Sequence, residues 1–215
     1  MRMRKKKHGR ARLDDCGGLW ARTPEEHKGG WRGVFGGNQP IHLEIGCGKG
    51  AFITQTALAN PGVNYIAVEK LIDVLVLAAE KAKAANLSNV RFILGDAALL
   101  EEMFAHGEIE RIYINFCDPW HKYKHRKRRL TGGAFLEIYK RLLRGDGEIF
   151  FKTDNQRLFE FSLNSFCDNG FKLKNITLDL HNSGFEGNIM TEYEKLFSDM
   201  GKPVYRLEAS SCFAK

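Results

Sequence analysis

From residue 41 onward the chain alternates short runs rich in β-branched and aromatic residues with longer segments of helical periodicity. Alternation with this period is typical of strands joined by crossover helices, which build a parallel sheet with helices on both faces. Five strands are expected at Ile41–Cys47, Tyr65–Glu69, Val90–Leu94, Arg111–Phe116 and Gly147–Lys152. Helices are expected at Gly50–Asn60, Leu71–Ala85, Ala97–Phe104, Thr131–Leu143 and Gln156–Cys167.

Two further β-type runs, Lys172–Leu180 and Val204–Ser210, lie on either side of a helical stretch at Thr191–Asp199. They extend the prediction to a doubly wound α/β fold with a mostly parallel, seven-stranded sheet. No internal repeat or low-complexity linker divides the 215 residues. We therefore expect a basic, Gly-rich N-terminal arm over residues 1–35 and a single domain over residues 36–215.

The formal net charge of +7 is concentrated in two segments. Residues 1–12 contain seven Lys or Arg side chains, residues 121–129 contain six, and neither segment contains an acid. These 13 cations leave the rest of the chain at −6. Because like charges packed this densely repel one another, the pattern favours a polyanionic partner. Nucleic acid is the leading candidate, since neither segment has the apolar face that binding to an anionic membrane surface requires.

Composition and cysteine spacing exclude several other classes of protein. No apolar run approaches the roughly 18 residues of a membrane helix, and no apolar stretch follows the basic N-terminus, as a secretory signal requires. Five widely spaced cysteines indicate reduced thiols in a cytoplasmic protein. Cys117, His121 and His125 have helical ligand spacing, but Pro119 and the surrounding cations disfavour a metal site there. We therefore predict no metal and no membrane association.

The first expected strand runs into a glycine-rich segment, Glu44–Gly50 (EIGCGKG), just before a helix. Glycines at alternate positions let the backbone approach a ligand, and the following helix N-terminus offers free N–H groups. The lysine of the loop is followed by glycine, which excludes a Walker A phosphate loop. The loop loosely fits a dinucleotide fingerprint, so an NAD oxidoreductase remains a distant alternative.

Each of the next three strands ends in or is followed by an acidic residue, at about the position that the glycine loop has relative to the first strand. Glu69 ends the second strand, Asp96 follows the third, and Asp118 follows the fourth. In an open parallel sheet these positions share the carboxyl edge, where ligands bind. Glu69 can accept both ribose hydroxyls of an adenosine, and Asp96 can accept a proton from the adenine amino group.

Together with Glu44, an acid in an otherwise apolar strand, these features resemble the class I S-adenosylmethionine-dependent methyltransferases. The resemblance implies a Rossmann-like sheet and S-adenosyl-L-methionine as cofactor. It implies cofactor contacts at Glu44, Gly46, Gly48, Gly50, Glu69, Asp96 and Asp118.

The segment after the fourth strand, Asn115–Trp120 (NFCDPW), is followed at once by the basic run His121–Arg129. An acid, a proline and an aromatic at a strand end suggest a pocket for a flat base, on which Trp120 can stack. This stretch closely resembles the signature of the bacterial tRNA (guanine-N7)-methyltransferases. The resemblance continues in Lys152–Asn155 (KTDN) and Thr191–Lys195 (TEYEK), and covers roughly residues 41–208.

The match is not complete. Cys117 and His121 stand where that family has prolines, and Tyr123 replaces a common basic residue. Asp118, Pro119, Trp120, Lys122 and Lys127–Arg129 follow the family pattern.

In that family a methyl group is transferred to N7 of a guanine, position 46, in the tRNA variable loop. The resemblance implies a tRNA substrate and a catalytic role for Asp118. It implies substrate contacts at Lys122, Asp154, Thr191, Glu192, Tyr193 and Glu194. It implies RNA contacts at Lys124, His125, Arg126, Lys127, Arg128 and Arg129.

The expected chemistry suits these side chains. Guanine N7 carries no hydrogen and has an in-plane lone pair, so no base has to remove a proton before attack. Positive charge develops on the purine instead, and a carboxylate beside the ring opposes it. We assign Asp118 to orientation and electrostatic stabilisation. Alternatives are a class I methyltransferase acting on another RNA, a small molecule or a protein amine, and an RNA-binding protein with a decayed cofactor site. The sequence leaves open whether the chain is a monomer or a homodimer.

Overall fold

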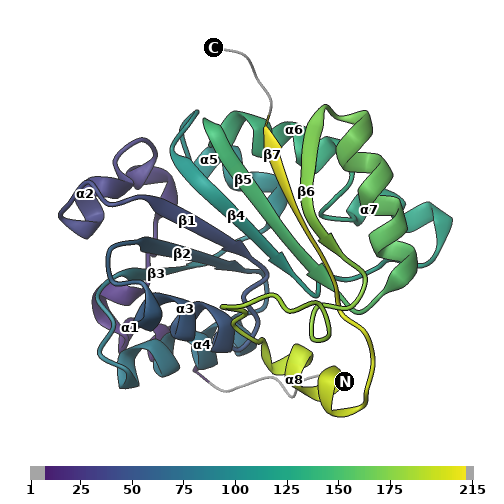
Figure 1. Cartoon of the computed structure of the whole chain (residues 1–215). Coiled ribbons are helices and arrows are strands. Elements are labelled where there is room, and N and C mark those ends of the chain that lie inside the picture. Colours follow the sequence, from purple (N-terminus) through teal and green to yellow (C-terminus); the bar gives the residue numbers. More distant parts are fainter. Residues whose placement is uncertain (1–7, 212–215) are drawn as a thin grey trace.

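The computed structural model describes residues 8–211, so Arg2, Arg4, Lys5–Lys7 and Cys212 lie outside the described residues. The chain folds around one seven-stranded sheet with the order β3-β2-β1-β4-β5-β7-β6 (Figure 1). The strands are β1 (Ile41–Ile45), β2 (Asn64–Glu69), β3 (Val90–Leu94), β4 (Ile109–Asn115), β5 (Leu143–Thr153), β6 (Phe171–Thr177) and β7 (Tyr205–Ser211).

Strands β1–β5 pair in parallel, and β7 runs antiparallel to β5 and β6. The prediction of a mostly parallel, seven-stranded sheet is therefore confirmed. The strand order reverses between β1 and β4, and ligands bind at such a switch point, outside the carboxyl ends of the strands. Strand β5 begins four residues earlier than predicted, because Leu143 pairs with Ile109 before an irregularity interrupts the ladder.

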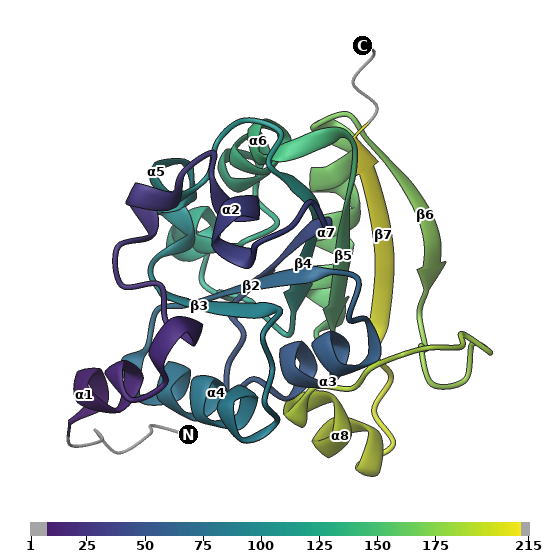
Figure 2. The same ribbon diagram turned by 90° about the vertical axis from the view of Figure 1, so that its left-hand side faces the viewer.

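Helices cover both faces of the sheet (Figures 1 and 2). Helices α3 (Ala51–Ala59) and α4 (Ile72–Ala84) lie on one face, and α5 (Leu100–Met103), α6 (Gly133–Leu142) and α7 (Gln156–Asp168) lie on the other. Each face has its own apolar core, in which side chains of these helices pack on the strands. None of the helices within residues 8–211 is long and apolar enough to cross a membrane.

Residues 9–35, expected to belong to a basic arm, are instead folded onto both faces of the sheet. Helix α1 (Gly9–Asp14) buries Leu13 in the core beside α4, and α2 (Trp31–Phe35) buries Trp31 in the opposite core. The Trp31 indole N–H donates to the Met103 carbonyl at 2.9 Å. The sequence pattern did not reveal this packing because the few apolar side chains are isolated among glycines and charges, without a strand or helix period.

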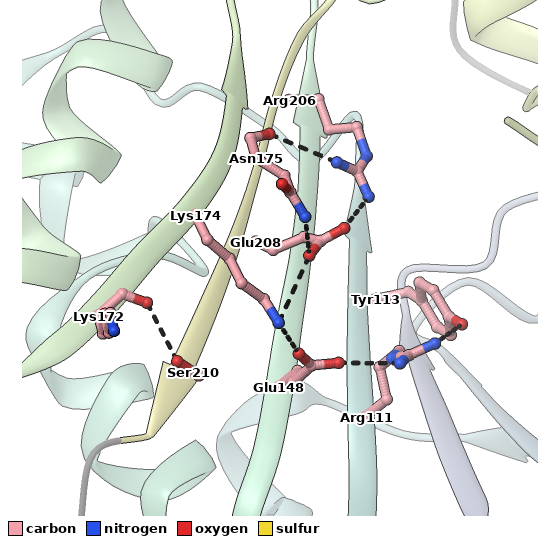
Figure 3. A network of polar contacts seen from close by, with 9 residues as sticks. All are labelled: Arg111, Tyr113, Glu148, Lys172, Lys174, Asn175, Arg206, Glu208 and Ser210. Atoms are coloured by element: carbon pink, nitrogen blue, oxygen red, sulfur yellow. Dashed lines mark hydrogen bonds and ion pairs between the residues drawn. The ribbon is translucent and has the colours of Figure 1, made fainter. Parts of the chain in front are cut away.

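A chain of ion pairs crosses the strands β4, β5, β7 and β6 (Figure 3). Arg111 pairs with Glu148 at 2.8 Å, Lys174 bridges Glu148 and Glu208, and Glu208 also pairs with Arg206. Opposite charges on neighbouring strands stabilise the sheet through cross-strand contacts. This network joins the antiparallel β6–β7 pair to the parallel part of the sheet.

Candidate active site

The glycine loop between β1 and α3 has a backbone that only glycine adopts readily. The φ angles of Gly46, Gly48 and Gly50 are 78°, 56° and 79°. A Cβ at Gly46 or Gly48 would meet nothing within 4 Å, so the loop leaves open space beside its backbone. A Cβ at Gly50 would instead lie 2.6 Å from the Cβ of Ala78, because the loop passes directly over α4.

Replacing Gly50 with alanine is expected to lower the free energy of unfolding by roughly 2–4 kcal/mol, from the left-handed φ and the overlap with Ala78. Gly46→Ala is the matched control, since it has the same φ cost without the overlap and is expected to lose about 1 kcal/mol. Urea unfolding of both variants measures the difference. Equal losses would show that close approach to α4 does not matter.

Glu44, on the central strand β1, has a carboxyl group of which only one oxygen has a hydrogen-bond partner among residues 8–211. The side chain is 2% exposed, and one oxygen accepts a hydrogen bond from the Asn115 amide at 3.1 Å. The other oxygen, Oε2, has no partner among the described residues. Burial raises the pKa of Glu44 to about 8. Since a buried polar atom without a partner is costly, Glu44 Oε2 indicates a place for a ligand that donates a hydrogen bond or carries positive charge.

Glu69 and Asp96 lie at the ends of β2 and β3, as predicted. Glu69 accepts hydrogen bonds from the Gly48 N–H at 3.2 Å and the Leu71 N–H at 2.9 Å, so it also shapes the glycine loop. Asp96 accepts from the Ala98 N–H at 3.0 Å and pairs with Lys70 at 2.5 Å. The hydrogen bond from Lys70 lowers the pKa of Asp96. Backbone N–H groups therefore hold both side chains in place at the carboxyl edge.

Asp118 lies in a tight loop that begins where β4 ends. The Phe116 N–H continues the ladder by donating to the Lys152 carbonyl at 2.9 Å. Phe116 and Trp120 then adopt φ angles of 52° and 43°, which for bulky side chains cost about 1–3 kcal/mol each. The side chain of Asp118 is exposed, and within residues 8–211 no hydrogen bond or ion pair engages its carboxylate. The strained loop thus presents a free carboxylate at the carboxyl edge.

A second carboxylate, that of Asp154, follows the neighbouring strand β5. Residue 115 pairs with residue 152 in the parallel ladder, which brings the ends of β4 and β5 together. Asp154 is partly buried, and the described part of the chain offers its carboxylate no hydrogen bond or ion pair. The next residue, Asn155, caps α7 by accepting from the Leu158 N–H at 2.9 Å. The sequence therefore places Asp154 between a strand end and a helix cap, on the same edge as Asp118.

Helix α8 (Glu192–Asp199) lies beside α3 below the carboxyl edge (Figures 1 and 2). Thr191 and Glu194 form a capping box at its start. Glu194 is fully buried and pairs with the buried Lys152 at 2.7 Å, whereas Glu192 pairs with Lys81 at the surface and Tyr193 is 61% exposed. Of the four residues expected to contact substrate here, Glu194 is the one whose carboxylate is enclosed by protein groups.

The basic run after Asp118 forms the short 3₁₀ helix η4 (Tyr123–Arg128). Lys122, Lys124, Arg126, Lys127 and Arg128 are exposed and His125 is partly buried. The centres of the Trp120 and His125 rings are 5.7 Å apart, and the guanidinium carbon of Arg128 lies 4.9 Å from the centre of the Trp120 ring. Arg129 differs from the others, because it is 9% exposed. A cavity of about 590 Å³ lies between η4 and α7, and Arg126, Arg157 and Phe161 line it.

Comparisons with known proteins identify the family. Residues 38–207 match the family described as "Putative methyltransferase". The tRNA (guanine-N(7)-)-methyltransferase of Listeria monocytogenes serotype 4b (strain F2365) is 53% identical over 209 residues, which are 97% of this chain and 98% of that protein. The protein of the same name from Geobacillus sp. (strain WCH70) is 56% identical over 186 residues, which are 86% of this chain and 84% of that protein. The chain belongs to the tRNA (guanine-N(7)-)-methyltransferase family.

Solved structures agree with this family at the level of the fold. The 16S rRNA methyltransferase KamB is similar with a TM-score of 0.60, covering 98% of this chain and 96% of that chain at 13% identity. An antibiotic-related methyltransferase has a TM-score of 0.59, covering 97% and 96% at 18% identity. The predicted Rossmann-like methyltransferase fold is therefore confirmed.

In this member of the tRNA (guanine-N(7)-)-methyltransferase family, the glycine loop, Glu69, Asp96, Asp118 and Asp154 lie at or just after the carboxyl ends of parallel strands, whereas Thr191–Glu194 lie at the start of α8 and the basic run forms η4. Among the partners of those residues that the sequence analysis missed are Asn115, which donates to Glu44, and Lys152, which pairs with Glu194. Both residues belong to segments that resemble the family. A polar side chain at the end of an otherwise apolar strand was the signal that could have indicated a buried polar partner.

Proposed function

We propose that this protein transfers a methyl group from S-adenosyl-L-methionine to N7 of guanine 46 in the variable loop of tRNA. The single observation that carries the proposal is the pair of carboxylates of Asp118 and Asp154, which have no hydrogen bond or ion pair within residues 8–211 and lie at adjacent strand ends beside the exposed cations of η4. The names of relatives about half identical over nearly the whole chain support the reaction and the substrate.

The residues at the carboxyl edge fit the cofactor. Open space beside Gly46 and Gly48 leaves room for a ligand against the loop backbone, and the buried Glu44 Oε2 has no hydrogen-bond partner among residues 8–211. We assign Glu44, the three glycines, Glu69 and Asp96 to cofactor binding. A cationic group at Glu44 Oε2 would favour the charged carboxylate and lower its raised pKa. S-adenosyl-L-methionine supplies an electrophilic methyl group when bound.

The protein's own contribution to the reaction is orientation and electrostatics. The guanine needs no deprotonation at N7, so no general base is required. Asp118 and Asp154 accept hydrogen bonds from the N1–H and amino group of the base and oppose the positive charge that grows on the purine. Trp120, between His125 and Arg128, offers an aromatic face near the loop. A guanine held in tertiary pairing has to be unstacked before it reaches these groups.

The decisive experiment combines the purified protein, unmodified tRNA and cofactor carrying a labelled methyl group. Label should enter tRNA, and chemical cleavage specific for N7-methylguanine should map it to the variable loop. Label at another base, or only in a protein or small molecule, would replace this function with the alternative methyltransferase. Failure to bind the cofactor by calorimetry would favour an RNA-binding protein without catalysis.

Binding of tRNA is expected to weaken steeply with salt. Replacing Arg126, Lys127 and Arg128 together with alanine should reduce the slope of log affinity against log salt by roughly 2–3, because each lost phosphate contact contributes about 0.7–0.9. The control replaces Arg144 and Lys172, each the second residue of its strand, and Lys28, whose neighbour Gly29 contacts Glu108 just before β4. This variant should leave the slope unchanged. Equal slopes for the two triple variants would remove η4 from the RNA-binding surface.

A further inference from the structure

Arg129 ends the basic run in sequence, but its surroundings differ from those of its neighbours. Arg126, Lys127 and Arg128 are exposed, whereas Arg129 is 9% exposed. Its guanidinium carbon lies 4.4 Å from the centre of the Phe161 ring, on α7. A phosphate of a bound RNA therefore has little of this side chain to contact. Two of its guanidinium nitrogens instead donate to protein carbonyls, and the side chain forms part of the wall of the cavity between η4 and α7.

Those contacts are made with the loop that carries Asp118. Arg129 Nε donates to the Pro119 carbonyl at 2.9 Å, and its Nη2 donates to the Trp120 carbonyl at 3.4 Å. The planar guanidinium thus donates hydrogen bonds to the carbonyls of the two residues that directly follow Asp118. Lysine has a single ammonium and lacks the flat face for Phe161, so it cannot reproduce this geometry.

The Asp118 loop needs such support because its backbone is strained on both sides of the carboxylate. Phe116 and Trp120 have positive φ angles, which persist only when surrounding groups hold them. The ladder bond from the Phe116 N–H fixes the first end of the loop. Arg129 fixes the second end.

Arg129 is itself anchored to α7. The segment after it turns through a bond from the Gly132 N–H to the Arg129 carbonyl at 2.9 Å. Thr131 and Ser162 then share a buried hydroxyl hydrogen bond of 2.7 Å. A rigid helix is in this way connected through Arg129 to the loop of the free carboxylate.

We propose that Arg129 is a positioning residue that holds Asp118 in place for the reaction and does not bind tRNA phosphate. The proposal rests on the proposed function, and it separates Arg129 from the RNA contacts expected for the rest of the basic run. Its effect on methyl transfer passes through Asp118.

The test is a double-mutant cycle between Arg129→Ala and Asp118→Ala, read as the single-turnover rate at saturating tRNA and cofactor. Arg129→Ala should lower this rate by about 10²-fold, the effect of a misplaced catalytic group. The double variant should be no slower than Asp118→Ala alone. The salt dependence of tRNA binding should remain that of the wild type. Lys127→Ala, an exposed neighbour, serves as comparator and should flatten the salt slope.

A multiplicative loss in the double variant, or a salt slope flattened by Arg129→Ala as by Lys127→Ala, would overturn the proposal. Arg129→Lys keeps the charge and most of the buried aliphatic part of the side chain. If the alanine variant does not fold, this variant tests whether the two hydrogen bonds from the guanidinium to the loop carbonyls matter. It should retain the salt slope yet transfer at least about 10-fold more slowly. A wild-type rate for Arg129→Lys would also refute the proposal. If the wild-type protein does not methylate tRNA, the proposed function itself fails, which is a distinguishable outcome.

Discussion

Replacing Asp118 with alanine is expected to lower methyl transfer to tRNA by about 10²–10³-fold, the usual effect of removing one electrostatic group from a reacting centre. Its carboxylate is exposed and makes no hydrogen bond or ion pair within residues 8–211, so its loss leaves no hydrogen-bond partner unsatisfied. The folded protein should therefore remain as stable as the wild type. Single-turnover transfer of labelled methyl groups and thermal unfolding measure the two effects separately.

Two further variants sharpen the Asp118 prediction. Asp118→Asn keeps the size and the hydrogen-bond acceptor but removes the charge, so an intermediate rate would separate orientation from electrostatic stabilisation. Asp146→Ala removes an exposed carboxylate at the start of β5, far along the strand from the site, and should transfer at the wild-type rate. Full activity in Asp118→Ala would show that this carboxylate has no role in the reaction.

Breaking the buried Lys152–Glu194 ion pair is expected to have the largest effect on stability. Both side chains are buried, and Glu194 also accepts from the Asn188 amide at 2.6 Å. Lys152→Met leaves the carboxylate buried without its cation, which costs about 3–5 kcal/mol. For a protein of this size the loss corresponds to roughly 6–20 °C in the midpoint of thermal unfolding.

Helix α8 provides a matched control for this pair. Lys81 and Glu192 make an ion pair of similar length, 2.6 Å, but their side chains are 40% and 38% exposed. Lys81→Met should therefore cost at most about 1 kcal/mol. Combining Lys152→Met with Glu194→Gln removes both charges and should restore most of the stability. If Lys152→Met melted like Lys81→Met, the buried pair would not be what anchors α8.

Most of the fold was predictable because it follows from local periodicity. The strands β1, β2, β3 and β4 begin and end within two residues of their predicted positions. Short apolar runs between helical segments predict strands because they are too short to form helices of their own. The irregular start of β5 was not predictable, because the pairing of Leu143 with Ile109 is decided by the neighbouring strand. The packing of Trp31 and Leu13 was missed for a related reason: isolated apolar side chains carry no period.

The site shows the same division. Gly46, Gly48 and Gly50 were predictable as a tight glycine turn after β1, and all three have the positive φ angles that favour glycine. Their role in ligand binding stays a prediction. Asp96 and Glu69 could be placed at one edge because parallel strands end together. The site residues implied by family resemblance stay predictions, and the sequence did not reveal which of them are buried and which are exposed.

The sequence by itself determined the parallel sheet, the edge that carries the glycine loop and the acids, and the basic segment beside them. These features depend on residue type and spacing along the chain. Only the tertiary structure decided which members of a motif face solvent and which are enclosed. Arg129 and Arg128 are neighbours of the same charge, yet Phe161 and two loop carbonyls enclose only Arg129. Glu194 and Glu192 differ likewise, because Lys152 reaches one of them from a distant strand. Burial of a charge requires a partner brought by another element, and the partner's position is a property of the fold.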